Sequence, residues 1–351
     1  MLIKYKMITK QIERIRKNKM KKKRAVQVIT WIITAVFLLS GCSIQKTEKN
    51  EKAITVVTTN FPLYDFAKAV LGDGSGELSG SVHMLLSPGM ESHSYEPTPQ
   101  DIIKIQDCDL FLYIGGENDA WVEEILTSMD EPVRTMKLMD YVELMEEDEM
   151  GHEHEHENEQ EEEIEYDEHI WTSPANAAVM VQAIQEEICA ICDEKQKKSG
   201  LGSDVPASDI FRQNGEEYTR EIEQLDQKFR DYFDGVKNKT IFFGDRFPFA
   251  YFTKEYGLSY EAAFPGCYEG SEPSAATITG LIDDARKLGV STIYYIEFSN
   301  HQIADVIADS IGGNTAMIHS CHNVTWEEME DGRTYVDLMT TNLRTFTETM
   351  K

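Results

Sequence analysis

Short apolar runs alternate with amphipathic stretches on both sides of one long helical segment, and this alternation limits the possible folds more than any other feature. Three runs in the first part of the chain and four in the last part have the length and the β-branched and aromatic content of buried strands. Strands separated by helices form parallel sheets with right-handed crossovers. The pattern predicts an α/β protein with two lobes of parallel sheet flanked by helices. The predicted strands are 54–59, 81–87, 109–115, 240–244, 258–264, 292–297 and 315–320.

The segment 208–235 is predicted to be a single linking helix. Its apolar residues follow one another at steps of seven, four, three, four and four, which places them in one stripe. At 1.5 Å per residue such a helix is about 40 Å long and can span a whole domain. We therefore expect an N-terminal lobe at 54–207 and a C-terminal lobe at 236–351. The stripe consists of Phe211, Tyr218, Ile222, Leu225, Phe229 and Phe233.

The N-terminus is typical of an export signal. A basic stretch precedes AVQVITWIITAVFLLSGCS, which has the apolar core and small-residue end of a signal peptide over residues 1–41. Its last four residues, Leu39 to Cys42, fit a bacterial lipobox, so Cys42 is predicted to carry the lipid and 42–53 to form a short tether. Met20 opens a compact basic region and is an alternative start. A membrane-spanning helix is the other reading, but the apolar run is short for a bilayer. The protein is predicted to work outside the cytoplasmic membrane, anchored to its outer face.

The charge of the chain argues against nucleic-acid binding. The whole sequence has 34 basic and 62 acidic residues, and residues 1–41 contain 11 of the basic and one of the acidic residues. The remaining 310 residues therefore carry 23 basic and 61 acidic side chains, a formal net charge of −38. So strongly negative a surface repels phosphate backbones. The length suffices for two domains with their own cores.

An acidic, histidine-rich run separates the two halves of the N-terminal lobe. Between Glu146 and His169 the chain has fourteen acidic residues, four histidines and no basic residue. Imidazole suits zinc, copper or nickel, and carboxylates attract any divalent cation. The loop 146–168 is predicted to collect metal ions through His152, His154 and His156, and a solvated acidic linker is the alternative.

Four metal-competent side chains fall in loops or just after predicted strands: His93, His169, Asp245 and His322. In parallel sheets ligands bind at the carboxyl ends of the strands. Two of these residues come from each lobe, so one ion bound by all four would lie in the cleft between the lobes. The sequence therefore predicts a metal site that couples lobe closure to binding.

Four segments carry a resemblance to a known family. GMESHSYEPTP, DEHIWTSPANA, FAYFTKEYGL and YVDLMTTNLRTF resemble the zinc- and manganese-specific substrate-binding lipoproteins of ABC transporters. The resemblance covers nearly the whole mature chain. It implies two lobes bridged by a long helix that limits hinge motion, one metal in the cleft, and delivery of the ion to a membrane permease with its ATPase.

The resemblance also assigns site residues. His93 and His169 take the places of the family's first two histidine ligands. Counting back from the YF pair of FAYFTKEYGL puts Arg246 at the third ligand position, and one extra residue near Pro248 restores Asp245. Arginine stays protonated and cannot bind a cation.

His322 stands where the family usually has an acid, and His301 and Glu297 are alternatives for this fourth position. Glu297 is better suited to orient a ligand histidine through its second ring nitrogen. The cysteines Cys267 and Cys321 both fall in C-terminal loops and are predicted to form a disulfide, which an extracytoplasmic location permits.

Three histidines and one carboxylate suit Zn²⁺ better than Mn²⁺, which favours oxygen ligands. Zinc is therefore predicted as the transported ion of a monomeric receptor, with manganese as the alternative. A zinc hydrolase is a rival of another class, but the chain has no HExxH or HxxEH motif, so no enzyme activity is predicted. A surface metal buffer or adhesin, in which the acidic run is the working part, is the third alternative.

Overall fold

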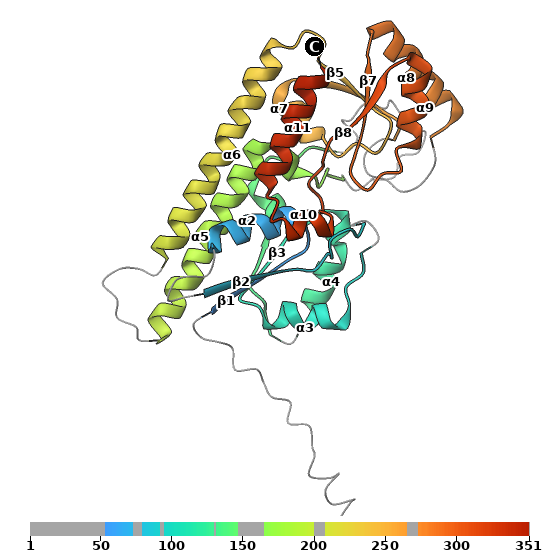
Figure 1. Cartoon of the computed structure of the whole chain (residues 1–351). Helices are drawn as coiled ribbons and strands as arrows, with labels where there is room; N and C mark the ends of the chain where they lie inside the picture. The colour runs from blue at the N-terminus through green and yellow to red at the C-terminus, as the bar shows by residue number, and fades with distance from the viewer. Residues whose placement is uncertain are drawn as a thin grey trace, which may run out of the picture. The chain divides into compact units, whose positions relative to one another are not determined.

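Two four-stranded sheets form the framework of the protein (Figure 1). The computed structural model describes residues 53–72, 79–91, 95–129, 131–146, 165–199, 208–264 and 273–350. The strand order is β2-β1-β3-β4 in the N-terminal sheet and β6-β5-β7-β8 in the C-terminal sheet. Every neighbouring pair in both sheets is parallel, so the predicted α/β class is confirmed.

The N-terminal sheet and its helices account for the first half of the chain. Its elements are β1 (Ala53–Thr58), α2 (Phe61–Leu71), β2 (Ser79–Met84), α3 (Pro99–Asp107), β3 (Leu110–Tyr113), the 3₁₀ turn η1 (Glu117–Asp119), α4 (Ala120–Ser128), β4 (Thr135–Lys137), η2 (Leu138–Tyr141), η4 (Ile170–Thr172) and α5 (Pro174–Ser199).

The long helix and the C-terminal sheet follow. Their elements are α6 (Asp209–Gly235), β5 (Thr240–Phe243), α7 (Ala250–Tyr256), β6 (Ser259–Ala262), α8 (Ala275–Leu288), β7 (Thr292–Tyr295), α9 (Gln302–Ile311), β8 (Asn314–Met317), α10 (Trp326–Glu330) and α11 (Tyr335–Thr349).

Several predicted features lie outside the described residues. They are the signal peptide 1–41, Cys42, His93, the accessory histidines at 152, 154 and 156, and Cys267. Within the described ranges, no helix combines the length and the apolar composition needed to cross a bilayer.

The helices begin where side chains can satisfy their first free N–H groups. Thr98 and Asp101 form a capping box at α3, and Thr325 and Glu328 form another at α10. The side chain of Asn60 caps α2 directly after β1. The Asn60 cap begins α2 at the carboxyl end of β1, where Thr59 and Asn60 line a cavity described below.

The α6 helix joins the cores of the two sheets, as its predicted stripe requires. All six stripe residues are buried, and they belong to one cluster that runs from Ile54 in β1 through α6 to Phe243 in β5 and Phe346 in α11. Figure 1 shows α6, in yellow, running beside α5 and on past the C-terminal sheet. A large rotation of one sheet against the other would expose apolar area along this helix, which is unfavourable.

Candidate metal centre

His169 is held in a fixed orientation by an aspartate two residues before it. The side chain of Asp167 accepts hydrogen bonds from the His169 backbone N–H at 2.6 Å and from the ring Nδ1 at 2.9 Å. Both residues are almost fully buried. A ring that donates from Nδ1 carries the lone pair of the neutral imidazole on Nε2, which is the form that binds a metal.

His322 approaches His169 from the other sheet. It follows β8, and its ring centroid lies 5.5 Å from that of His169, with the two ring planes at 86°. Two imidazoles on one tetrahedral zinc, with Zn–N bonds of about 2.0 Å, have centroids roughly 5 Å apart. The two rings are therefore spaced as two ligands of a single ion would be.

Hydrogen bonds between the two halves of the molecule surround this pair. Trp171 donates its indole N–H to the Ser320 carbonyl at 2.9 Å, and Tyr335 donates its hydroxyl to the Trp171 carbonyl at 2.8 Å. The Phe61 N–H bonds the His322 carbonyl at 3.3 Å. The loops that carry His169 and His322 are thus fixed to each other by contacts outside the imidazole rings.

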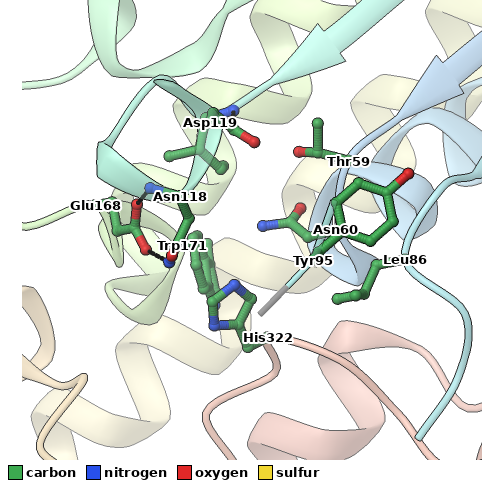
Figure 2. A pocket seen from close by; sticks show the side chains of 10 residues that line it. Thr59, Asn60, Leu86, Tyr95, Asn118, Asp119, Glu168, Trp171 and His322 are labelled. Atoms are coloured by element: carbon green, nitrogen blue, oxygen red, sulfur yellow. Dashed lines mark hydrogen bonds between the residues drawn. The ribbon is translucent and has the colours of Figure 1, made fainter. Parts of the chain in front are cut away.

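His322 lines two adjoining cavities. The first, shown in Figure 2, has His322 facing Trp171, with Asn118, Asp119 and Glu168 among the polar side chains around it. The second is lined by residues of the loops after β5, β7 and β8 and of the loop after β2. The described residues that line it include Met90, Glu91, Arg246, Glu297, Ser320 and Asn323.

Two buried carboxyl groups make the first cavity acidic. Glu168 accepts hydrogen bonds from the backbone and side chain of Asn118, and Asp119 accepts from the backbone of Ile114 and Gly115. Burial raises the pKa of Glu168 to about 7 and that of Asp119 to about 6, because the charged form is poorly solvated there. A nearby divalent cation would favour their ionised forms, so the cavity suits a positively charged ligand.

Glu297 supports the loop of His322 from the second cavity. Its carboxylate accepts hydrogen bonds from the N–H of Ser320 at 2.7 Å and from the Ser320 hydroxyl. The same hydroxyl accepts the His322 N–H at 3.2 Å. Glu297 is therefore connected to His322 through Ser320. From this position its carboxylate can orient the loop that carries His322 or offer an oxygen to the ion.

His319 is also buried against Glu297, at 3.6 Å from its ring Nδ1. Burial by itself would lower the pKa of His319, but Glu297 and Glu328 outweigh it, so the pKa is raised above its ordinary value. Its Nδ1 accepts a hydrogen bond from the Cys321 N–H at 2.9 Å. This ring is therefore used to shape the turn before His322.

Backbone strain is concentrated in the same loops. Among the described residues other than glycine, Phe298, His301 and Cys321 have positive φ angles, and all three follow strands β7 or β8. A left-handed conformation is unfavourable for such side chains and tends to be retained at functional sites.

Asp245, a predicted ligand, makes backbone hydrogen bonds after β5, and its role as a ligand stays a prediction. Its carboxylate accepts the N–H of Arg246 at 2.8 Å and the N–H of Ile296 at 3.4 Å, and it is not among the described residues that line either cavity. The Asp245 carboxylate thereby satisfies N–H groups just after β5 and β7.

The alternative ligand His301 lies at the exposed start of a helix. It begins α9, is about half exposed, and its Nδ1 bonds Asp305 at 2.9 Å. Among the described residues, no three His, Cys, Asp or Glu side chains form a group that could hold a metal, and His93 lies outside them. The described cysteines form no disulfide with one another, and the pairing of Cys321 with Cys267 stays a prediction.

Asp167 was not predicted from the sequence to belong to the site. Its position two residues before His169 could have indicated a role in orienting that ring. However, the surrounding run is so acidic that no single carboxylate is distinguished by the sequence. Only the hydrogen bond to Nδ1 distinguishes it from its neighbours.

Replacing Asp167 by asparagine is expected to weaken zinc binding by roughly 10- to 100-fold, the usual cost of losing a residue that orients a ligand histidine. Asparagine can present its N–H₂ group to Nδ1 and disfavour the required tautomer. Competition with a zinc chelator of known affinity measures the change. The matched control is Asp305→Asn, which alters an Asp–His pair of the same 2.9 Å spacing at His301. Equal effects of both substitutions would contradict the role of Asp167.

Comparisons with known proteins agree with this geometry. Residues 56–349 match the model of a protein family described as "Zinc-uptake complex component A periplasmic". The chain is 33% identical over 320 residues to the high-affinity zinc uptake system protein ZnuA of Bacillus subtilis, covering 89% of this chain and 94% of the relative. It is 29% identical over 330 residues to the zinc-binding lipoprotein AdcA of Streptococcus pneumoniae, covering 93% of this chain but only 61% of that relative.

A solved structure has the same fold. The Zn(II)-bound ZnuA-like domain of Streptococcus pneumoniae AdcA superposes with a TM-score of 0.67 at 26% identity, over 85% of this chain and 99% of that domain. The family model covers most of the chain. The chain therefore belongs to the family of periplasmic zinc-uptake component A proteins.

Proposed function

We propose that this protein is an extracytoplasmic receptor that binds one zinc ion between its two sheets and delivers it to an ABC transporter permease for uptake. The observation that carries the proposal is the His169–His322 pair, whose rings come from the two halves of the molecule at the spacing of zinc ligands. The names of the similar proteins, which refer to zinc uptake and zinc binding, support the same ion.

The proposed ligand set combines both histidines with His93 and one carboxylate. For the carboxylate we prefer Glu297 to Asp245, because Glu297 lines a cavity with His322 and bonds the loop that carries this histidine. Three imidazoles and one oxygen suit zinc better than manganese. The set leaves no open coordination position for a catalytic water, so the proposal includes no enzyme activity.

We also propose roles for the lipidation site and for the acidic run. Cys42 carries the lipid that anchors the receptor to the outer face of the membrane, and the acidic run with His152, His154 and His156 raises the local zinc concentration beside the cleft. The receptor works as a monomer.

Deletion of residues 147–164 tests the receptor against the metal-buffer alternative. We expect zinc titration of the deletion variant to retain one tight site and to lose only weak binding. A companion variant with the three accessory histidines replaced by asparagine keeps the loop's length and should behave likewise. Loss of the tight site in both variants would support a buffer, and tighter binding of manganese than zinc would contradict the proposed ion.

A further inference from the structure

A tight turn from the N-terminal sheet lies against the loop of His322. The chain after β2 continues as Ser87-Pro88-Gly89-Met90, and the Met90 N–H bonds the Ser87 carbonyl at 3.1 Å. Gly89 has a φ of 77°. Proline at the second position and a left-handed glycine at the third are typical of a type II turn. The turn is therefore a rigid unit that can be held from outside.

The side chain of Asn323 holds this turn from the other half of the molecule. Its Nδ2 donates to the carbonyl of Ser87 at 2.8 Å and to the carbonyl of Met90 at 2.9 Å. Its Oδ1 accepts the N–H of Val324 at 2.8 Å. The backbone adds a fourth bond at the same place, from the Gly89 N–H to the Val324 carbonyl at 2.8 Å.

These bonds are shielded from water. Asn323 is only 2% exposed, and both hydrogens of its amide and its oxygen are used. Buried hydrogen bonds are expensive to break when their groups are left unsatisfied. The ion pair between Arg246 and Glu91, at 3.0 Å, fastens the end of the same turn, but it is partly exposed and contributes less.

The position of Asn323 connects this contact to the metal site. It directly follows His322, and both residues line the second cavity together with Met90. Separating the two halves of the molecule along this edge requires both amide hydrogen bonds to break. The same movement displaces the loop that carries His322.

We infer that Asn323 is a positioning residue that fastens the Ser87–Met90 turn to the loop of His322 and thereby sets the rate at which bound metal is released. The inference rests on the proposed function, since it presupposes a metal ion held by His322. Asn323 itself does not bind the ion.

The test is zinc release from the full-length protein carrying Asn323→Asp. Aspartate has nearly the same shape but removes both donors and directs a carboxylate at two carbonyl oxygens. Release into excess chelator, followed by stopped flow, is expected to become roughly tenfold faster or more, as for other residues that position ligands. The absorption bands of the Co²⁺-loaded protein should stay unchanged, because the ligands are the same.

Asn214→Asp is the matched control. Asn214, on α6, also donates its side-chain amide to a backbone carbonyl, that of Val70, at 3.1 Å, and it lines neither cavity. It removes one partly buried hydrogen bond, so it should lower the melting temperature somewhat without changing the release rate. If Asn323→Asp does not fold, Asn323→Ala removes the donors without adding a charge and carries the same expectation.

The outcomes separate this inference from the proposed function. Faster release from the Asn323 variant alone, with unchanged Co²⁺ bands, supports the inference. Equal release rates in the wild type and the Asn323 variant, or equal acceleration in both variants, overturn it. Absence of a tight zinc site in the wild-type protein overturns the proposed function instead.

Discussion

Replacing His169 or His322 by alanine is expected to weaken zinc binding by roughly a hundredfold to a thousandfold, because about 10–16 kcal/mol of zinc binding is shared among four ligands. Each substitution removes one imidazole of the pair whose centroids lie 5.5 Å apart. The remaining ligands can hold the ion only with water in the vacant position. Competition titration with a high-affinity zinc indicator measures the affinity of each variant.

The histidine that should not matter is His301. It is exposed and bonds Asp305, so His301→Ala should bind zinc with wild-type affinity. A His322→Ala variant that keeps the wild-type affinity would show that the ring pair is not part of the site. Weaker zinc binding by the His301→Ala variant would indicate that the loop after β7, and not the loop after β8, supplies the histidine ligand.

Replacing Phe229 by alanine is expected to lower the free energy of unfolding by about 3–5 kcal/mol, the usual cost of removing a fully buried phenylalanine. Its ring contacts those of Phe233, Phe252 and Tyr256, with centroids between 5.2 and 6.1 Å away. This cluster joins α6 to α7, which lies between β5 and β6 in the chain. Denaturant unfolding followed by circular dichroism measures the loss.

Lys228→Ala is the control for the helix itself. It alters the residue before Phe229 on the exposed face of α6, where the change should be within about 0.5 kcal/mol. If Phe229→Ala were as mild as this control, α6 would not carry the shared core, and the two halves could move more freely than the packing indicates.

Much of the fold could be predicted because strand and helix periodicities are local. The stripe on α6 and the strands β1, β3, β5 and β7 stand out as apolar runs. The strand β4, Thr135–Lys137, was missed because three residues paired at a sheet edge leave almost no pattern.

The site could be predicted only in part. Strand-end position and resemblance to the family led to His169 and His322, which the structure brings together. The same reasoning could not distinguish Asp245 from Glu297, because both are acidic residues just after a strand. The difference lies in which backbone N–H groups each carboxylate meets, and that depends on packing between loops. Asn323 left no signal either, since its partners are carbonyl groups more than 230 positions away in the sequence.

The most direct test of the proposed site is the zinc anomalous signal in crystals of the zinc-loaded protein. We predict a strong peak between the rings of His169 and His322, about 2.0–2.1 Å from a nitrogen of each ring and bonded to Nε2 of His169. A strong peak elsewhere, with neither ring within bonding distance, would contradict the proposed site.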